Sequence, residues 1–179
     1  MVVRQVNDEP RPGRDESVAV LYQRHYNELA RLAYGLLGDR GAADEVVQDA
    51  FAVLLSRWSS LRDADAADGY LRAAVINGAR SRWRRRRVRE RAFATSQRDP
   101  AMQVDNVVEQ SVVLAAVRQL PMRKRACVLL RFYADLSEAE TASVLGVSVG
   151  TVKSQTSKAL DQLAGLLAPN ESEVGHERF

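Results

Sequence analysis

The sequence has almost no cysteine and little lysine. Cys127 is its only thiol, which excludes a disulfide framework and a thiolate metal cluster. No apolar run reaches the length of a membrane span, and the first residues, MVVRQVNDEPRPGRDES, lack the apolar core of a signal peptide. We therefore expect a soluble, cytoplasmic protein that is not inserted in a membrane.

Residues that could carry catalysis or hold a metal are also scarce. His25 lies in an apolar stripe and is interpreted as a core or boundary residue, whereas His176 lies in a polar tail. Neither has potential metal ligands at a useful spacing. No arrangement of a nucleophile and a base can be recognised, so we predict no enzyme, no metal and no cofactor. Cys127 is most simply a small buried apolar residue.

What the sequence does contain is helical spacing of apolar residues. The first helix should cover residues 18–36 and end near Gly38. A second helix should begin after the letters GDRG and reach about Trp58. Residues 61–69, LRDADAADG, have little periodicity and predict a loop. A third helix opens at Tyr70 and leads directly into a run of arginines.

That run, SRWRRRRVRER, holds seven arginines in residues 81–91. Residues 69–91 carry a local charge of +8, which leaves −5 for the rest of the chain. A solvated helix end, a targeting signal or a surface for a polyanion could explain the run. The charge division favours a surface for nucleic acid or anionic lipid. Because the run continues a helix with an apolar beginning, its end should project from the core.

Residues 88–107 have mixed composition and no steady period, which is typical of a linker. Helical spacing resumes at Val108, and a further helix should contain the apolar residues from Ala126 to Phe132. No internal repeat is present.

The stretch LSEAETASVLGVSVGTVKSQTSKALDQLAGLL then predicts a helix-turn-helix. Ser137 and Glu140 form a capping box that begins its first helix. Gly146 suits the sharp turn, Val147 should plug it, and Ser148 is a suitable N-cap for the second helix. The expected buried side of the first helix is formed by Ala139, Ala142, Val144 and Leu145.

The second helix of this motif has one apolar face and one polar face. The apolar face contains Val152, Thr156, Ala159, Leu163 and Leu166. Hydroxyls, an amide and lysines are left outside: Thr151, Lys153, Ser154, Gln155, Ser157 and Lys158. Such side chains suit phosphates and base edges in a major groove. The alternative is a pair of packed helices with a merely solvated polar face.

Three stretches in order resemble the extracytoplasmic-function (group IV) sigma factors of bacterial RNA polymerase, within the sigma-70 family. They are LYQRHYNELARLAYGLLGDRGAADEVVQDAF, GYLRAAVINGARSRWRRRR and LPMRKRACVLLRFYADLSEAETASVLGVSVGTVKSQTSKAL. The resemblance covers roughly residues 17–167. Two departures are that Ile76 stands where the family often has arginine, and that two arginines expected in the last helix are missing.

The resemblance implies an all-α fold of two small helical domains joined by a flexible linker. The implied divisions are a disordered tail (1–15), a region 2-like domain (16–90), a linker (91–107), a region 4-like helix-turn-helix domain (108–168) and a second tail (169–179). The first domain would bind the −10 element and the clamp helices of core RNA polymerase. The second would bind the −35 element and the polymerase flap. An anti-sigma factor is a further implied partner.

The resemblance also implies site residues, which extend the candidates chosen from spacing. Polymerase docking falls on Asp44, Glu45, Gln48 and Asp49. Contact with −10 DNA falls on Asn77, Arg80, Trp83, Arg84 and Arg87, and contact with −35 DNA falls on the six polar residues of the last helix. Trp83 could instead anchor the helix in the N-terminal core. The acidic loop with Asp63 and Asp65 lies where the family captures an extruded base.

The predicted function is that of a sigma factor, which directs core polymerase to promoters and assists promoter melting. The alternative is a stand-alone helix-turn-helix regulator that binds duplex DNA without polymerase. A protein-binding adaptor would leave the arginine run unexplained.

Overall fold

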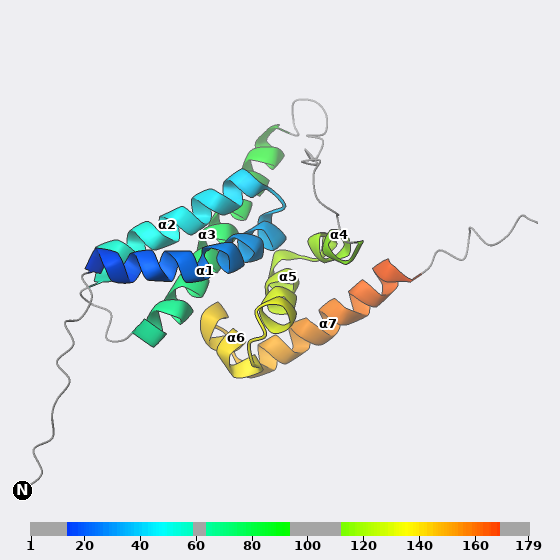
Figure 1. Ribbon diagram of the computed structural model, residues 1–179. Coiled ribbons are helices and arrows are strands. Elements are labelled where there is room, and N and C mark those ends of the chain that lie inside the picture. The colour runs from blue at the N-terminus through cyan, green and yellow to red at the C-terminus, as the bar shows by residue number, and fades with distance from the viewer. Residues whose placement is uncertain (1–13, 59–63, 94–111, 169–179) are drawn as a thin grey trace, which may run out of the picture.

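The computed structural model describes residues 14–58, 64–93 and 112–168 (Figure 1). Every regular element within these ranges is a helix, in agreement with the predicted all-α fold. The elements are α1 (Arg14–Leu37), α2 (Arg40–Arg57), α3 (Ala64–Phe93), α4 (Val112–Gln119), α5 (Met122–Val128), the π-helical turn η2 (Leu129–Tyr133), α6 (Glu138–Leu145) and α7 (Val149–Leu167). We call α1–α3 the N-terminal lobe and α4–α7 the C-terminal lobe.

The first two helices follow the predicted pattern closely. The apolar stripe of α1 is buried, and the helix ends before Gly38, whose φ of +74° is readily adopted only by glycine. Asp39 caps α2 by accepting a hydrogen bond of 2.9 Å from the backbone N–H of Ala42. Because of this cap, α2 begins at Arg40 and includes the last residues of the GDRG turn.

The loop predicted for residues 61–69 is wrong from Ala64 onward, because α3 already begins there. Alanine favours a helix, and Ala67 is completely buried against the other helices of the lobe. Asp68 is held by α1, with its Oδ1 atom 2.9 Å from Nε2 of His25. These tertiary contacts stabilise a first turn that has no amphipathic period of its own.

The other end of α3 also extends further than predicted. The helix continues to Phe93, so residues 91–93 of the expected linker are helical. An ion pair of 2.8 Å between Arg86 and Glu90, one helical turn apart, supports this exposed last part. The rest of the predicted linker and both predicted tails lie outside the described residues, apart from the start of α1.

The helix predicted to run through Phe132 is interrupted. The backbone N–H of Ala134 donates to the carbonyl of Leu129 at 3.0 Å, five residues back, which marks the wider π-helical turn η2. The wider turn leaves Phe132 61% exposed, although the sequence placed it in the apolar period. Asp135 follows with a φ of +50°.

Replacing Asp135 with glycine should stabilise the protein. A φ of +50° places the Asp135 Cβ close to the following carbonyl, and glycine has no Cβ to clash. We expect Asp135→Gly to raise the free energy of unfolding by about 0.5–1 kcal/mol, measured by urea denaturation. Asp135→Ala keeps the Cβ and should give no gain. An equal gain from both substitutions would contradict the backbone explanation.

The helix-turn-helix forms as the sequence predicts. The backbone N–H of Ser137 donates to Glu140 at 2.7 Å, and the Ser137 hydroxyl accepts from the N–H of Glu140 at 3.2 Å. These hydrogen bonds hold the pKa of Glu140 below its ordinary value. Gly146 has a φ of +64°, and the Ser148 hydroxyl caps α7 by accepting from Thr151 at 3.1 Å. The predicted caps and turn are therefore confirmed.

Three of the burial predictions for this motif are wrong. Val147 is 40% exposed and does not plug the turn, while Ala139 and Leu166 also face solvent. Thr141 is fully buried in their place. Ala142 is buried as predicted, and Val144 and Leu145 are half-buried, so the predicted buried side of α6 fails only at Ala139.

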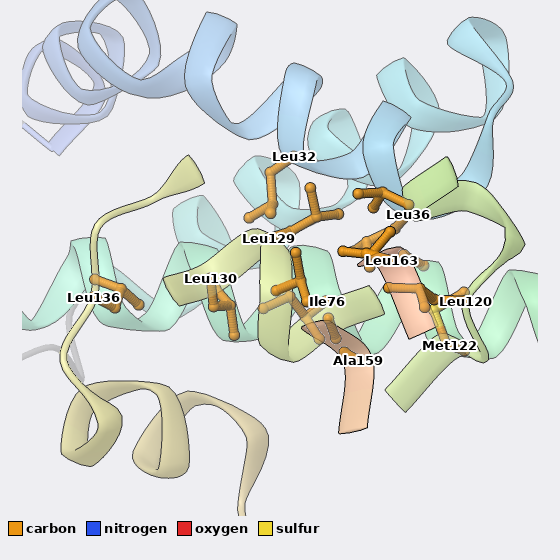
Figure 2. Close-up of a cluster of buried hydrophobic side chains, with 14 of the residues drawn as sticks. Leu32, Leu36, Ile76, Leu120, Met122, Leu129, Leu130, Leu136, Ala159 and Leu163 are labelled. Carbon is orange, nitrogen blue, oxygen red and sulfur yellow. The ribbon is translucent and has the colours of Figure 1, made fainter. Parts of the chain in front are cut away.

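The two lobes share one apolar core. Leu32 and Leu36 of α1 and Ile76 of α3 lie in the same buried cluster as Leu129 and Leu130 of η2. Figure 2 shows these side chains meeting between the lobes, with Leu120, Met122, Ala159 and Leu163 around them. A second cluster lies among α1, α2 and α3 alone. The C-terminal lobe is thus packed onto the N-terminal lobe.

Candidate nucleic-acid interface

The arginine run forms the exposed end of α3. Residues 84–89 are all exposed, and so is Asn77, two turns earlier on the same helix. Arg80 lies between them and is half-buried. The helix therefore presents a cationic surface to solvent, while its first half is packed in the lobe.

Trp83 is turned partly toward the protein. Its ring packs against the core shared by the lobes, and the Arg87 guanidinium lies 5.3 Å from the ring centroid. The sequence left two roles open for this ring, which could stack on an unpaired base or anchor α3 in the core. In this conformation the ring is an anchor that also supports Arg87 by a cation–π contact.

The acidic residues predicted as a patch on α2 make contacts with two neighbouring helices, α1 and α3. Asp44 accepts a hydrogen bond of 3.0 Å from the Tyr26 hydroxyl of α1, and burial together with Asp44 raises the pKa of Tyr26 to about 12. Glu45 forms an ion pair with Arg82 of α3, and Asp49 lies 3.9 Å from the same guanidinium. Gln48 is exposed.

Arg82 is one of the arginines of the run that the sequence did not single out. It is next to Trp83 and outside the face shared by Asn77, Arg80 and Arg84, so helical spacing did not select it. Its guanidinium instead joins α3 to Glu45 of the acidic patch, so that the two predicted binding surfaces are in electrostatic contact.

A double-mutant cycle tests this contact. The variants Arg82→Gln and Glu45→Gln should each lose the same pair, so their combined effect on unfolding free energy should be smaller than the sum. We expect a coupling energy of about 0.3–1 kcal/mol, because both side chains remain solvated. The pair Arg31→Gln with Glu45→Gln, from exposed positions on α1 and α2, should be additive. Additivity in the first cycle would show that the ion pair contributes nothing.

The last helix presents its polar face as predicted. Val152 and Ala159 are fully buried on the inner side of α7. Five of the six predicted DNA contacts are exposed on the outer side, and Gln155 is half-buried; the exposed five are Thr151, Lys153, Ser154, Ser157 and Lys158. Lys153 lies 3.5 Å from Glu138 of α6, so it has an ion-pair partner within the motif.

Two properties of the described ranges bear on other kinds of function. Their histidines, cysteine and acids do not gather in any group of three that could hold a metal ion. None of their helices is long and apolar enough to cross a membrane. The surfaces that distinguish the described part of the molecule are thus the cationic end of α3, the polar face of α7 and the acids of α2.

Comparison with known proteins agrees with this architecture. Residues 21–89 match the family described as Sigma-70 region 2, and residues 110–163 match Sigma-70, region 4. The RNA polymerase sigma-E factor of Streptomyces coelicolor is 34% identical over 139 residues, which cover 75% of this chain and 77% of that protein. The ECF RNA polymerase sigma factor SigM of Mycobacterium tuberculosis is 33% identical over 147 residues, covering 82% and 75%.

Solved structures give the same result for the fold. The structure of CnrH in complex with the cytosolic domain of CnrY is similar with a TM-score of 0.62 and 25% identity, over 84% of this chain and 86% of that one. The sigma factor RpoE of Bartonella quintana, solved with the anti-sigma factor NepR, has a TM-score of 0.63 at 20% identity, over 84% and 98%.

The chain belongs to the sigma-70 family of RNA polymerase sigma factors, in its extracytoplasmic-function group. It directs core RNA polymerase to promoters, and the stand-alone regulator is not favoured.

Proposed function

We propose that the two cationic and polar surfaces divide promoter recognition between them. The exposed end of α3 binds the −10 element, and the outer face of α7 binds the −35 element. The observation that carries this proposal is that the outer face of α7 lies opposite a buried apolar face, and that the exposed end of α3 continues a helix whose first half is packed in the N-terminal lobe. Each is therefore held rigidly by a packed lobe, as a DNA-reading helix requires.

Within the −10 surface the residues have different roles. Asn77, Arg80 and Arg84 follow one face of α3 and can contact bases and phosphates at fixed positions. Trp83 can stack on an unpaired base once it leaves the shared core. Arg87 adds phosphate contact. Asp63 lies outside the described residues, so the site that would capture an extruded base is assigned only to the start of α3.

In the −35 surface, phosphate and base contacts are mixed. Lys153 and Lys158 suit phosphates, while Gln155 carries an amide that can pair with an adenine edge. Thr151, Ser154 and Ser157 supply short hydroxyls. Because Lys153 is paired with Glu138, phosphate binding there exchanges one ion pair for another. Gln155 is the residue most able to carry sequence preference.

The acids of α2 are the proposed docking site for the clamp helices of core polymerase, and the C-terminal lobe binds the flap. The proposed domains are residues 16–90 and 108–168. The protein catalyses no reaction itself, since strand separation is driven by binding free energy. We place it in the cytoplasm with the polymerase. An anti-sigma factor is a proposed partner, in line with the relative CnrH, solved with the cytosolic domain of CnrY.

The deciding experiment is run-off transcription with purified core polymerase and a genomic library of templates. A sigma factor gives promoter-dependent transcripts that require both the chain and the core enzyme. A chain that binds DNA alone and leaves core activity unchanged on every template would contradict the proposal.

The double variant Ser154→Ala with Gln155→Ala should selectively weaken transcription from a template that contains the −35 element. Leu160→Ala, on the same helix, is the control.

A further inference from the structure

Two acids of the proposed docking site lie one helical turn apart on α2. The side chains of Glu45 and Asp49 are 62% and 78% exposed, so both carboxylates face solvent. Residues at this spacing are neighbours on the surface of a helix, and like charges there repel each other. The two acids therefore concentrate negative charge at one place, which favours the binding of a cation.

The cation that occupies this place in the structure is Arg82 of α3. Its Nη1 atom forms an ion pair with Oε2 of Glu45, and its Nη2 atom lies 3.9 Å from Oδ2 of Asp49. The Arg82 side chain is 29% exposed, in agreement with a position against α2. One guanidinium thus reaches both carboxylates and cancels one of their two negative charges.

The packing of α3 on α2 places Arg82 beside the acids. A Cβ added to Gly78 of α3 would lie 3.0 Å from Cγ1 of Val46, so the two helices approach each other closely at this point. Val46 is 2% exposed and adjoins Glu45 in the sequence. Arg82 follows Gly78 by one helical turn. The ion pair therefore forms one turn beyond a close contact of the fold.

Neighbouring arginines of the run have other surroundings. Arg86 forms its ion pair with Glu90 inside α3, and the Arg87 guanidinium lies near the ring of Trp83 on the same helix. The contacts of these two arginines stay within α3, whereas those of Arg82 extend to the acids of α2. Arg82 is therefore connected with polymerase docking in a way that Arg86 and Arg87 are not.

A partner that docks on carboxylates must present cations to them. Those cations and the Arg82 guanidinium compete for the same carboxylate oxygens of Glu45 and Asp49. Docking then exchanges an ion pair within the chain for an ion pair with the partner, so it gains less free energy than docking on unpaired acids. Because the side chains involved are partly solvated, the difference is modest.

We propose that Arg82 is an intramolecular competitor for the polymerase-docking site, which lowers the affinity of the chain for core polymerase by occupying Glu45 and Asp49. The inference rests on the proposed function, in which the acids of α2 receive the clamp helices. It gives one arginine of the run a role apart from promoter contact. In the complex, the guanidinium gives up the two carboxylates to the cations of the partner.

Equilibrium binding to core polymerase in the absence of DNA tests the competition. The full chain, with a fluorophore at its N-terminus, is titrated with purified core enzyme and followed by fluorescence anisotropy. Arg82→Gln should tighten binding by about two- to fivefold, which is the range that one solvated ion pair can supply. Arg86→Gln is the matched control, because it removes the same charge one turn further along α3 and leaves Glu45 paired. Its affinity should not rise.

The acids provide a second control. In a chain with Glu45→Gln and Asp49→Asn the competitor has no carboxylate to occupy, so adding Arg82→Gln should give no further gain. Arg82→Lys keeps the charge but replaces the planar fork with a single ammonium, so its gain should be smaller than that of Arg82→Gln. Raising the salt concentration should reduce the difference between Arg82→Gln and the wild type, because exposed charges are screened.

Four results would overturn the inference. Weaker binding by Arg82→Gln would mean that Arg82 holds the acids in place for the partner, and unchanged binding would mean that it does not compete. An equal gain in Arg86→Gln would indicate a general charge effect. A gain that persists without the two acids would place the effect elsewhere. If Arg82→Gln loses helical circular dichroism, Arg82→Lys carries the test and must still bind more tightly than the wild type.

Failure of the proposed function gives a different result. If the acids are not the docking site, Glu45→Gln with Asp49→Asn binds core polymerase as tightly as the wild type, whatever Arg82→Gln does. If the docking site is correct and the competition is not, the variant without the acids binds more weakly and Arg82→Gln brings no gain. The two variants therefore separate the inference from the function on which it rests.

Discussion

Replacing Arg85 and Arg87 together with glutamine should weaken binding of the holoenzyme to promoter DNA by about ten- to a hundredfold at physiological salt. Both side chains are exposed at the end of α3, where they can reach phosphates. Each lost phosphate contact also removes about 0.9 from the slope of log affinity against log salt concentration on duplex DNA. The slope should therefore fall by about two when fluorescence anisotropy is measured across a salt series.

Arg86 should behave differently from its two neighbours. It forms an ion pair of 2.8 Å with Glu90, so its charge is already partly balanced, and Arg86→Gln alone should have a smaller effect than Arg85→Gln. The matched control for Arg85→Gln with Arg87→Gln is the double variant Arg24→Gln with Arg31→Gln, which removes the same charge from exposed positions on α1. Equal losses in the two double variants would indicate a general charge effect. A changed promoter preference would show that the run reads sequence.

Local signals in the sequence were sufficient for much of the fold. The capping box at Ser137, the left-handed glycine at 146 and the cap at Ser148 each depend on neighbours within three residues. Such features are fixed by short-range hydrogen bonding and sterics, so sequence alone identifies them. The outer face of α7 follows from the same reasoning, because the cap sets where the helix begins and the period sets which residues face outward.

Features that depend on tertiary contact could not be predicted in this way. The first turn of α3 is helical because Ala67 is buried and Asp68 meets His25, 43 positions earlier in the chain. The π-helical turn after Val128 fits Leu129 between the lobes and turns Phe132 outward. Apolar periodicity marked both leucine and phenylalanine as core, since it carries no information about a local change of helical pitch.

The candidate site also combines features that local sequence signals predict with features that depend on tertiary contact. Exposure of Arg84 and of the serines on α7 follows from the helical period, whereas the partners of Arg82 and Lys153 lie on other helices. Trp83 had two open interpretations because the sequence does not say whether the second lobe lies against it. Ile76 was noted only as a departure from the family, and its burial gives that departure a role in joining the lobes.

Truncating Leu130 should destabilise both lobes. Its side chain has 0% exposure and lies in the shared core close to Ile76 of α3 (Figure 2). Leu130→Ala removes buried methyl groups and leaves a cavity, so we expect a loss of about 2–5 kcal/mol of unfolding free energy. For a chain of this length the melting temperature should fall by about 6–15 °C. Leu160→Ala, at a 44% exposed leucine of α7, should change it by very little.

The tryptophans make this measurement specific to coupling between the lobes. Both of them, Trp58 and Trp83, lie in the N-terminal lobe, whereas Leu130 lies in the C-terminal lobe. If the shared core joins the lobes, the melting transition followed by tryptophan fluorescence should shift together with the loss of helical circular dichroism. An unchanged tryptophan transition, beside a shifted circular dichroism transition, would mean that the lobes unfold separately. In that case the shared core would stabilise only the lobe that contributes Leu130, and the N-terminal lobe would depend on its own cluster around Leu54 and Leu71.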